Sequence, residues 1–226
     1  MTMIAIALSP DFCVVAADRA VGYLNESDKM VAKEQKTKIE YFTTEPMPFI
    51  ATCAGLSAAV HSIPQIINKL PRPITFRSDL PELTSFVSQR VKCEFPEKLW
   101  SAAPTTTYIV ALTGDNQLYF QAYHLNDDDM MAADDVKGHA GLIPAGFDPE
   151  SHEDRKMYWR EQLTQAISPS GSRTKAQRLE AVLEVFRGAF GECSTLNEFV
   201  SSNFDYCVIN KSDRSITFNG TPPAFN

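Results

Sequence analysis

The sequence predicts an α+β fold in which two antiparallel sheets stack face to face and each is covered by helices, a four-layer αββα sandwich. Three observations lead to this prediction. Strand-like segments follow one another across short turns, as in β-hairpins. Helix-like segments come in pairs between groups of strands. No internal repeat or low-complexity linker divides the 226 residues, so we expect a single domain over residues 1–226.

Two pairs of strands are expected in the first quarter of the chain. The apolar segments Ile4–Leu8 and Phe12–Ala17 flank Ser9-Pro10-Asp11, whose residue types favour a tight turn. The segments Lys38–Phe42 and Phe49–Ala54 form a second such pair. The residues between the two pairs show little periodicity.

The rest of the chain alternates between helix pairs and hairpins. Apolar residues recur at spacings of three and four in the helical segments, and turn-forming residues separate the strands of each hairpin. The expected order is helices over 60–70 and 80–95, strands over 105–112 and 117–124, helices over 155–167 and 175–190, and strands over 206–209 and 215–218.

Charge and composition exclude several classes of function. The chain has 21 Lys and Arg against 28 Asp and Glu, a formal net charge of −7, so no overall positive field would attract nucleic acid. No apolar run approaches the roughly 20 residues that cross a bilayer, and no signal-like segment is present. We therefore expect a cytoplasmic protein that binds neither nucleic acid nor membrane.

The sequence offers no clear site for a metal or a cofactor. Its four histidines form no HExxH motif, its five cysteines form no CxxC pair, and no glycine-rich phosphate loop occurs. The acidic segment Asp127–Asp135 lacks the alternating ligands and the closing Glu of a calcium loop. A solvated surface loop is the simpler interpretation of this segment, and we expect no metal and no cofactor.

The N-terminus contains a candidate nucleophile. Thr2 follows Met1, and a small second residue is the usual context for removal of the initiator methionine. Removal would leave a hydroxyl and a free α-amine on one residue, and an amine with a pKa of about 8 can accept the hydroxyl proton. Asp18 ends the partner strand, which a hairpin returns to the side of Thr2.

These residues resemble the opening of the proteasome β-type family, which comprises proteasome β subunits, the bacterial HslV peptidase and their bacterial relatives among the N-terminal nucleophile (Ntn) hydrolases. The family begins with a terminal Thr and carries an Asp at the sixteenth position after it, as Thr2 and Asp18 do. A Lys then opens an apolar strand, as Lys38 does. Gly55 follows a second apolar strand and precedes small residues, again as in the family. The resemblance implies the proteasome-subunit fold.

The resemblance also implies a role for each matching residue. Thr2 would attack a peptide carbonyl after removal of Met1, with its own amine as the base. Lys38 would lower the pKa of the nucleophile, and Asp18 would hold Lys38 in place. The backbone N–H of Gly55 would stabilise the oxyanion. The implied activity is peptide hydrolysis inside a self-assembled ring or related oligomer. The implied substrates are unfolded polypeptides, and the resemblance also allows an ATP-dependent unfoldase as a partner.

The spacing of the lysine differs from the family pattern. Lys38 lies further from Thr2 than the family lysine does, so an insertion within residues 25–36 is expected. Lys33 and Lys36 are alternative candidates for the same role. The apolar strand that follows Lys38 favours Lys38.

Two later motifs also differ. The family's Gly-Ser-Gly segment corresponds best to Lys137-Gly138-His139-Ala140-Gly141, which contains no serine. His139 is a candidate replacement for that serine as a polar neighbour of the amine. The family's late Asp-x-x-Ser-Gly element is only weakly matched by Ser201-Ser202-Asn203-Phe204-Asp205.

These differences leave two other functions open. A chain without the serine, or one that keeps Met1, would be a catalytically inactive protein of the same fold with a role in assembly or binding. The third alternative is an Ntn amidase that acts on a small molecule.

Overall fold

The structure is a computed structural model of the full chain. It describes residues 2–24, 30–70, 72–97, 105–125, 140–169 and 173–220. The acidic segment Asp127–Asp135, as well as His139, lies outside the described residues.

The described residues form strands, helices and one 3₁₀ turn. The strands are β1 (Ile4–Leu8), β2 (Phe12–Asp18), β3 (Ala20–Leu24), β4 (Met30–Gln35), β5 (Ile39–Phe42), β6 (Phe49–Ala54), β7 (Thr106–Leu112), β8 (Leu118–His124), β9 (Ala140–Ala145), β10 (Phe204–Asn210) and β11 (Ile216–Asn219). The helices are α1 (Ala58–His61), α2 (Ile63–Ile67), α3 (Leu80–Glu94), α5 (Glu153–Ile167) and α6 (Lys175–Leu196), and the 3₁₀ turn η1 (Arg77–Asp79) directly precedes α3.

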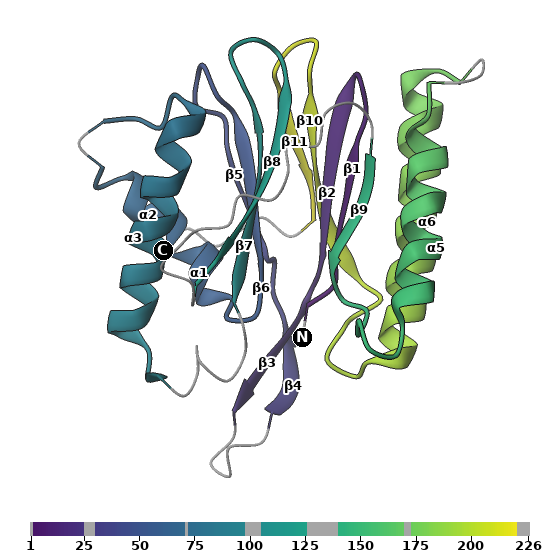
Figure 1. Ribbon diagram of the computed structural model, residues 1–226, viewed down its shortest axis with the longest axis horizontal. Coiled ribbons are helices and arrows are strands. Elements are labelled where there is room, and N and C mark those ends of the chain that lie inside the picture. The colour runs from purple at the N-terminus through teal and green to yellow at the C-terminus, as the bar shows by residue number, and fades with distance from the viewer. Residues whose placement is uncertain are drawn as a thin grey trace.

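These elements form four layers (Figure 1). One sheet has the strand order β5-β6-β7-β8 and is covered by α1, α2 and α3; the other has the order β11-β10-β2-β1-β9 and is covered by α5 and α6. In both sheets, each strand pairs antiparallel with its neighbours. The predicted αββα sandwich is therefore confirmed.

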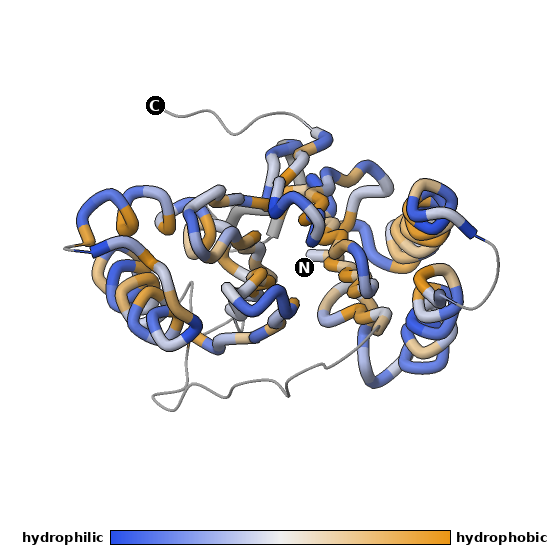
Figure 2. The backbone as a smooth tube through the Cα atoms, turned by 90° about the horizontal axis from the view of Figure 1, so that it is seen from above, coloured by the Kyte–Doolittle hydropathy of each residue, from blue (hydrophilic) through white to orange (hydrophobic). Residues whose placement is uncertain are grey.

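The strands at the centre of the five-stranded sheet are buried on both faces. Every residue of β1 and β2 is buried. Ile4, Ile6 and Leu8 pack between the two sheets, whereas Ala5 and Ala7 pack toward α5 and α6. Seen from above, hydrophobic residues dominate these central strands, while the outer helices alternate hydrophobic and hydrophilic residues (Figure 2). This burial on both faces explains why the two segments are almost continuously apolar.

The predicted helix over residues 60–70 is two short helices instead. Ser62 separates α1 from α2, and its hydroxyl donates to the carbonyl of Ala59 at 2.8 Å. Pro64 lies in the first turn of α2, where a missing N–H costs no helical hydrogen bond. The proline therefore starts a new helix instead of kinking a longer one.

Two structured regions were not predicted from the sequence. Residues of low periodicity form the two-stranded ribbon β3–β4, which projects beyond the end of both sheets near the N-terminus (Figure 1). The strand β9 contains Gly141 and Pro144, residue types that strands disfavour. Because β9 is an edge strand, Pro144 breaks no interior ladder.

No helix in the described parts of the chain is both long enough and apolar enough to cross a membrane.

Candidate active site

The β1–β2 hairpin brings Asp18 to the side of Thr2. Ile4 pairs with Ala17 in this hairpin, and the Asp18 N–H donates to the Met3 carbonyl at 3.0 Å. Thr2 directly precedes β1, and Asp18 is the last residue of β2. The local sequence alone therefore explains this part of the site, since a short hairpin returns its second strand to the start of the first.

The third residue of the site comes from the other sheet. Lys38 directly precedes β5, and its ammonium lies 2.9 Å from Asp18 Oδ1 and 3.2 Å from Thr2 Oγ1. Thr2, Asp18 and Lys38 are 4%, 0% and 2% exposed. One buried cation thus donates to both the candidate nucleophile and the carboxylate.

Lys38 is the lysine that reaches Asp18. Lys36 is exposed at the surface, and its backbone N–H donates to the Arg19 carbonyl at 2.9 Å. Lys33 lies in β4, and its side chain is outside the described part of the structure. The extra residues between Asp18 and Lys38 form the ribbon β3–β4, which accounts for the longer spacing.

Four donors fix the Asp18 carboxylate. Oδ1 accepts from Lys38 Nζ and from the Met3 N–H at 2.9 Å. Oδ2 accepts from the Ala20 N–H at 2.9 Å and the Ser201 N–H at 3.2 Å. Charge-assisted hydrogen bonds of this kind are about twice as strong as neutral ones. The carboxylate is therefore held rigidly in the orientation that meets Lys38.

The segment after α6 contributes to the site through its backbone. Ser201 belongs to the weakly matched late motif, and its amide, not its hydroxyl, meets Asp18. The neighbouring Arg19 makes an ion pair with Asp205 at 3.6 Å. Asp18 is consequently paired with Lys38, and Arg19 is directed to a different carboxylate.

Gly55 follows β6 in a conformation that favours glycine. Its φ is 93°, in the left-handed region. The next amide, Leu56 N–H, donates to Thr105 Oγ1 at 3.0 Å, and Thr105 is 2% exposed. Ile39 pairs with Thr52, so β6 runs past Lys38 toward Gly55. Gly55 and Lys38 therefore lie at the same end of the four-stranded sheet.

The predicted counterpart of the family's Gly-Ser-Gly segment is wrong. Strand β9 pairs antiparallel with β1, so Gly141 lies opposite Ala7, at the far end of β1, and Ala145 lies opposite Ile4. The residues that reach the end of β1 near Thr2 are therefore Ala145-Gly146-Phe147. The error arose because β9 was not predicted. Its register with β1 was therefore not available to choose between Gly141 and Gly146.

Gly146 is the glycine that packs against the site. It has a φ of 124°, and a Cβ placed on it would lie 2.2 Å from Met3 Sδ. The segment Ala145-Gly146-Phe147 carries no side-chain hydroxyl. Gly146 thus lets β9 approach the residue that follows Thr2.

The buried cysteine near Lys38 is not a competing nucleophile. Burial raises the pKa of Cys53 to about 11, although Lys38 acts in the opposite direction. A thiol with this pKa carries almost no thiolate at neutral pH. Within the described residues, no group of His, Cys, Asp and Glu could hold a metal ion.

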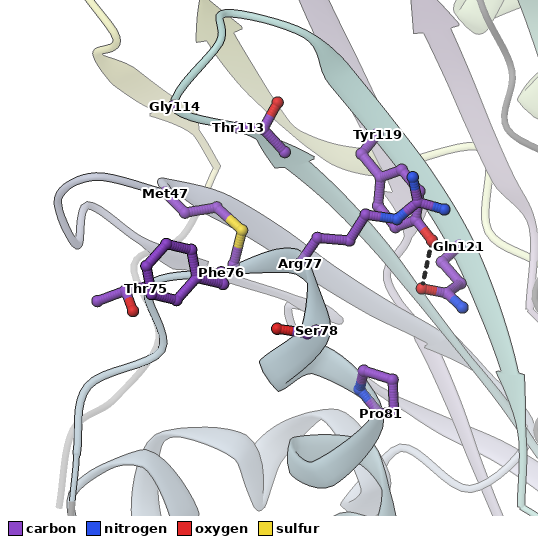
Figure 3. Close-up of a pocket in the computed structure, with 10 residues that line it drawn as sticks. All are labelled: Met47, Thr75, Phe76, Arg77, Ser78, Pro81, Thr113, Gly114, Tyr119 and Gln121. Carbon is purple, nitrogen blue, oxygen red and sulfur yellow. Dashed lines mark hydrogen bonds between the residues drawn. The ribbon is translucent and has the colours of Figure 1, made fainter.

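Two cavities of the described structure lie away from Thr2. One of about 540 Å³ adjoins η1 and the β7–β8 turn (Figure 3), and one of about 180 Å³ lies between α3 and β8. Thr2, Asp18 and Lys38 line neither of them. Thr2 is buried, and in the chain that still carries Met1 its nitrogen is part of a peptide bond.

The four-layer fold is similar to that of the solved structures of Anbu and HslV. The helical assembly of the Anbu complex from Pseudomonas aeruginosa has a TM-score of 0.61 at 14% identity, covering 99% of this chain and 88% of that one. Anbu from Hyphomicrobium sp. strain MC1 has a TM-score of 0.59 at 12% identity, with coverages of 96% and 85%. Eukaryotic HslV from Trypanosoma brucei has a TM-score of 0.50 at 12% identity, with coverages of 93% and 99%.

Sequence comparison alone gives no such relationship, because no protein-family model and no curated protein matches the chain. The likeness to Anbu and HslV confirms the resemblance at the level of the fold.

Proposed function

We propose that the protein is a threonine-type Ntn hydrolase that cleaves peptide bonds with Thr2 after removal of Met1. The observation that carries this proposal is the position of the Lys38 ammonium, which donates to Thr2 Oγ1 and to Asp18 Oδ1 at once. A buried ion pair contributes little net stability, because desolvation offsets its attraction. A role in stabilising a developing negative charge on Oγ1 accounts for its presence beside a hydroxyl.

The proposed reaction has two steps. The free amine of Thr2 takes the proton from Oγ1, directly or through a water molecule, as Oγ1 attacks the peptide carbonyl. The tetrahedral intermediate collapses when this proton passes to the leaving amine, which leaves an ester on Oγ1. Water, activated by the same amine, then hydrolyses the ester and regenerates Thr2.

Two further groups support the transition state in this proposal. The positive charge of Lys38 stabilises the attacking oxygen, and Asp18 keeps the ammonium in place. The Gly55 N–H is the proposed oxyanion donor, a contribution of about 2.7–4 kcal/mol in comparable acyl transfers. The positive φ of Gly55 turns its peptide away from the regular strand direction.

The proposal includes self-assembly. The Pseudomonas aeruginosa structure is described as a helical assembly of the Anbu complex, and we propose that this chain also forms a homo-oligomer. Unfolded polypeptides are then the proposed substrates, with an ATP-dependent unfoldase as the partner to test. A cytoplasmic location is part of the same proposal.

The decisive experiment is an intact mass measurement before and after incubation with an electrophilic probe for N-terminal threonine. We expect loss of the Met1 mass and then one probe adduct. Thr2→Ala should abolish the adduct, and Thr43→Ala, at an exposed threonine, should leave it unchanged. Retention of Met1 in the assembled protein, or an adduct that persists in Thr2→Ala, would refute the proposal.

One observation favours a second function, an inactive protein of this fold that acts in assembly or binding. The segment Ala145-Gly146-Phe147 supplies no hydroxyl near the Thr2 nitrogen. No hydroxyl from this segment can therefore assist proton transfer to or from the Thr2 amine. Retained Met1 together with a stable oligomer would support this alternative. Turnover of small amides without turnover of peptides would support the Ntn amidase.

A further inference from the structure

The backbone at the end of strand β9, residues 144–146, runs past the candidate active site. Strand β9 is the edge strand next to β1 (Figure 1), and its last paired residue is Ala145, opposite Ile4. Gly146 comes next, with a φ of 124°, and a Cβ placed on it would lie 3.0 Å from Met3 Cα. The register of the sheet therefore ends where this segment packs against the site.

One carbonyl of the 144–146 segment accepts a hydrogen bond from the helix layer. Cys193 lies in α6 and is buried, and its thiol donates to the Gly146 carbonyl at 3.2 Å. Burial, together with the negative charges of Asp18 and Glu192, raises the pKa of Cys193 to about 12. The thiol therefore keeps its proton at neutral pH, where it is a hydrogen-bond donor and not a nucleophile.

A second carbonyl of the same segment accepts from the opposite layer. Tyr108 lies in β7 of the four-stranded sheet, and its hydroxyl donates to the Pro144 carbonyl of the five-stranded sheet at 3.4 Å. Tyr108 is buried between the two sheets, and this burial raises the pKa of its hydroxyl, which stays protonated. The Tyr108 ring stacks on Phe120 with 7° between the ring planes. Two buried side chains from different layers thus hold residues 144–146.

Met3 connects the 144–146 segment to the Asp18 carboxylate. The Met3 N–H donates to Asp18 Oδ1 at 2.9 Å, and the Met3 carbonyl accepts from the Asp18 N–H at 3.0 Å. Met3 is fully buried, and a closely packed interior transmits a shift of one group to the next. A displacement of Gly146 against Met3 therefore reaches the carboxylate that orients Lys38.

The opposite end of β9 is held by a comparable contact that does not touch the site. The Gly141 N–H donates to Thr164 Oγ1 on α5 at 3.2 Å, and a Cβ on Gly141 would lie 2.4 Å from Leu163 Cβ. Gly141 lies opposite Ala7, at the end of β1 that is far from Thr2. Loss of the Thr164 hydroxyl is therefore a matched control for loss of a donor near the site.

We propose that Cys193 and Tyr108 are positioning residues for the proposed hydrolase reaction. Their donors hold the end of β9 against Met3 from two different layers, and Met3 in turn sets the Asp18 carboxylate that orients Lys38. This inference rests on the proposed function. It assigns a role to a buried thiol and a buried phenol that the reaction itself does not use.

The test follows labelling of the full-length protein by the N-terminal threonine probe over a range of probe concentrations. Tyr108→Phe and Cys193→Ala should each lower the maximal labelling rate about fivefold or more, with little change in the half-saturating concentration. Cys193→Ser restores a donor and should recover most of the rate, and Thr164→Val should label as the wild-type protein does. Each variant should still reach one adduct per chain, because a loss of stability alone would lower the labelled fraction and not the rate.

A second measurement does not depend on the chemistry of Thr2. With ¹³C at the methionine methyl groups, the Met3 signal should shift in Cys193→Ala and in Tyr108→Phe, which keeps the aromatic ring, but not in Thr164→Val. If the wild-type protein is never labelled, the hydrolase proposal fails, and the Met3 signal still decides whether the two residues hold the end of β9.

Two results would overturn the inference itself. An unchanged Met3 signal or an unchanged labelling rate, in either Tyr108→Phe or Cys193→Ala, would remove the positioning role of that residue. An equal loss of labelling rate in Thr164→Val would remove it for both residues, because any weakened contact of β9 would then have the same effect.

Discussion

At the scale of single residues, the site depends on one buried lysine. Lys38 comes from the four-stranded sheet and donates to Thr2 and Asp18, which belong to the five-stranded sheet. Asp18 has three backbone donors besides Lys38. The carboxylate can thus keep its position through the backbone, whereas Thr2 Oγ1 has Lys38 as its charged neighbour. This asymmetry makes Lys38 the most informative residue to change.

Replacing Lys38 should affect both stability and reactivity. Lys38→Met leaves Asp18 buried without its cation, which costs about 3–5 kcal/mol of unfolding free energy, and it should abolish labelling of Thr2. Denaturant unfolding and probe labelling measure the two effects. Lys36→Met, at the exposed lysine two residues earlier, should change stability by less than about 1 kcal/mol. Equal effects of the two substitutions would contradict the assigned geometry.

Thr105 is expected to act as a positioning residue for the proposed oxyanion donor. Thr105→Val removes the acceptor of the Leu56 N–H, next to Gly55. A small displacement of the Gly55 amide should lower kcat about 10–100-fold with little change in KM, and Thr105→Ser should restore it. A Thr105→Val enzyme with unchanged kcat would show that this turn needs no such support.

At the scale of elements, strand β9 closes the sheet beside β1 through a glycine contact. Gly146 has a positive φ, and its Cα lies against Met3, whose N–H holds Asp18. A side chain at this position would meet Met3 before any other part of the site. The packing of an edge strand is thereby coupled to the position of the Asp18 carboxylate.

Gly146→Ala should therefore destabilise the protein by about 1–3 kcal/mol, the usual cost of overpacking, and lower the rate of Thr2 labelling. Gly114→Ala is the matched control, because no atom lies within 4 Å of its Cβ position. Thermal or denaturant unfolding of the two variants gives the comparison. A Gly146→Ala variant as stable as the Gly114→Ala variant would mean that β9 can shift away without cost.

At the scale of the whole molecule, the stacking of the two sheets brings the candidate site together. Thr2 and Asp18 lie where β1 begins and β2 ends in the five-stranded sheet, and Lys38 directly precedes β5 of the four-stranded sheet. The geometry of the site therefore depends on how the two sheets pack against each other.

We expect the purified protein to form a homo-oligomer. Mass photometry or light scattering at micromolar concentration should show a particle of several subunits, and labelling of Thr2 should follow the oligomer fraction. A monomer with full labelling would contradict a self-compartmentalised enzyme. An oligomer that is never labelled would favour the assembly function.

The sequence by itself determined the local parts of this protein. The hairpin that joins Thr2 to Asp18 follows from two apolar segments and a short turn, because such contacts depend on neighbours in the chain. The strong hairpin around residues 113–116 and the long helices were predictable for the same reason. The layers followed from the order of these elements.

Only the tertiary structure decided which distant residues meet. The sequence favoured Lys38 over Lys36 through the strand that follows, but the contacts of Lys38 with Thr2 and Asp18 came from the tertiary structure. Gly146, which follows β9, could be placed near Thr2 only from the register of β9 with β1. The cavity beside Arg77 is formed by segments from three parts of the chain. Contacts of this kind depend on how strands pair and layers stack, and a one-residue change of register would replace every one of them.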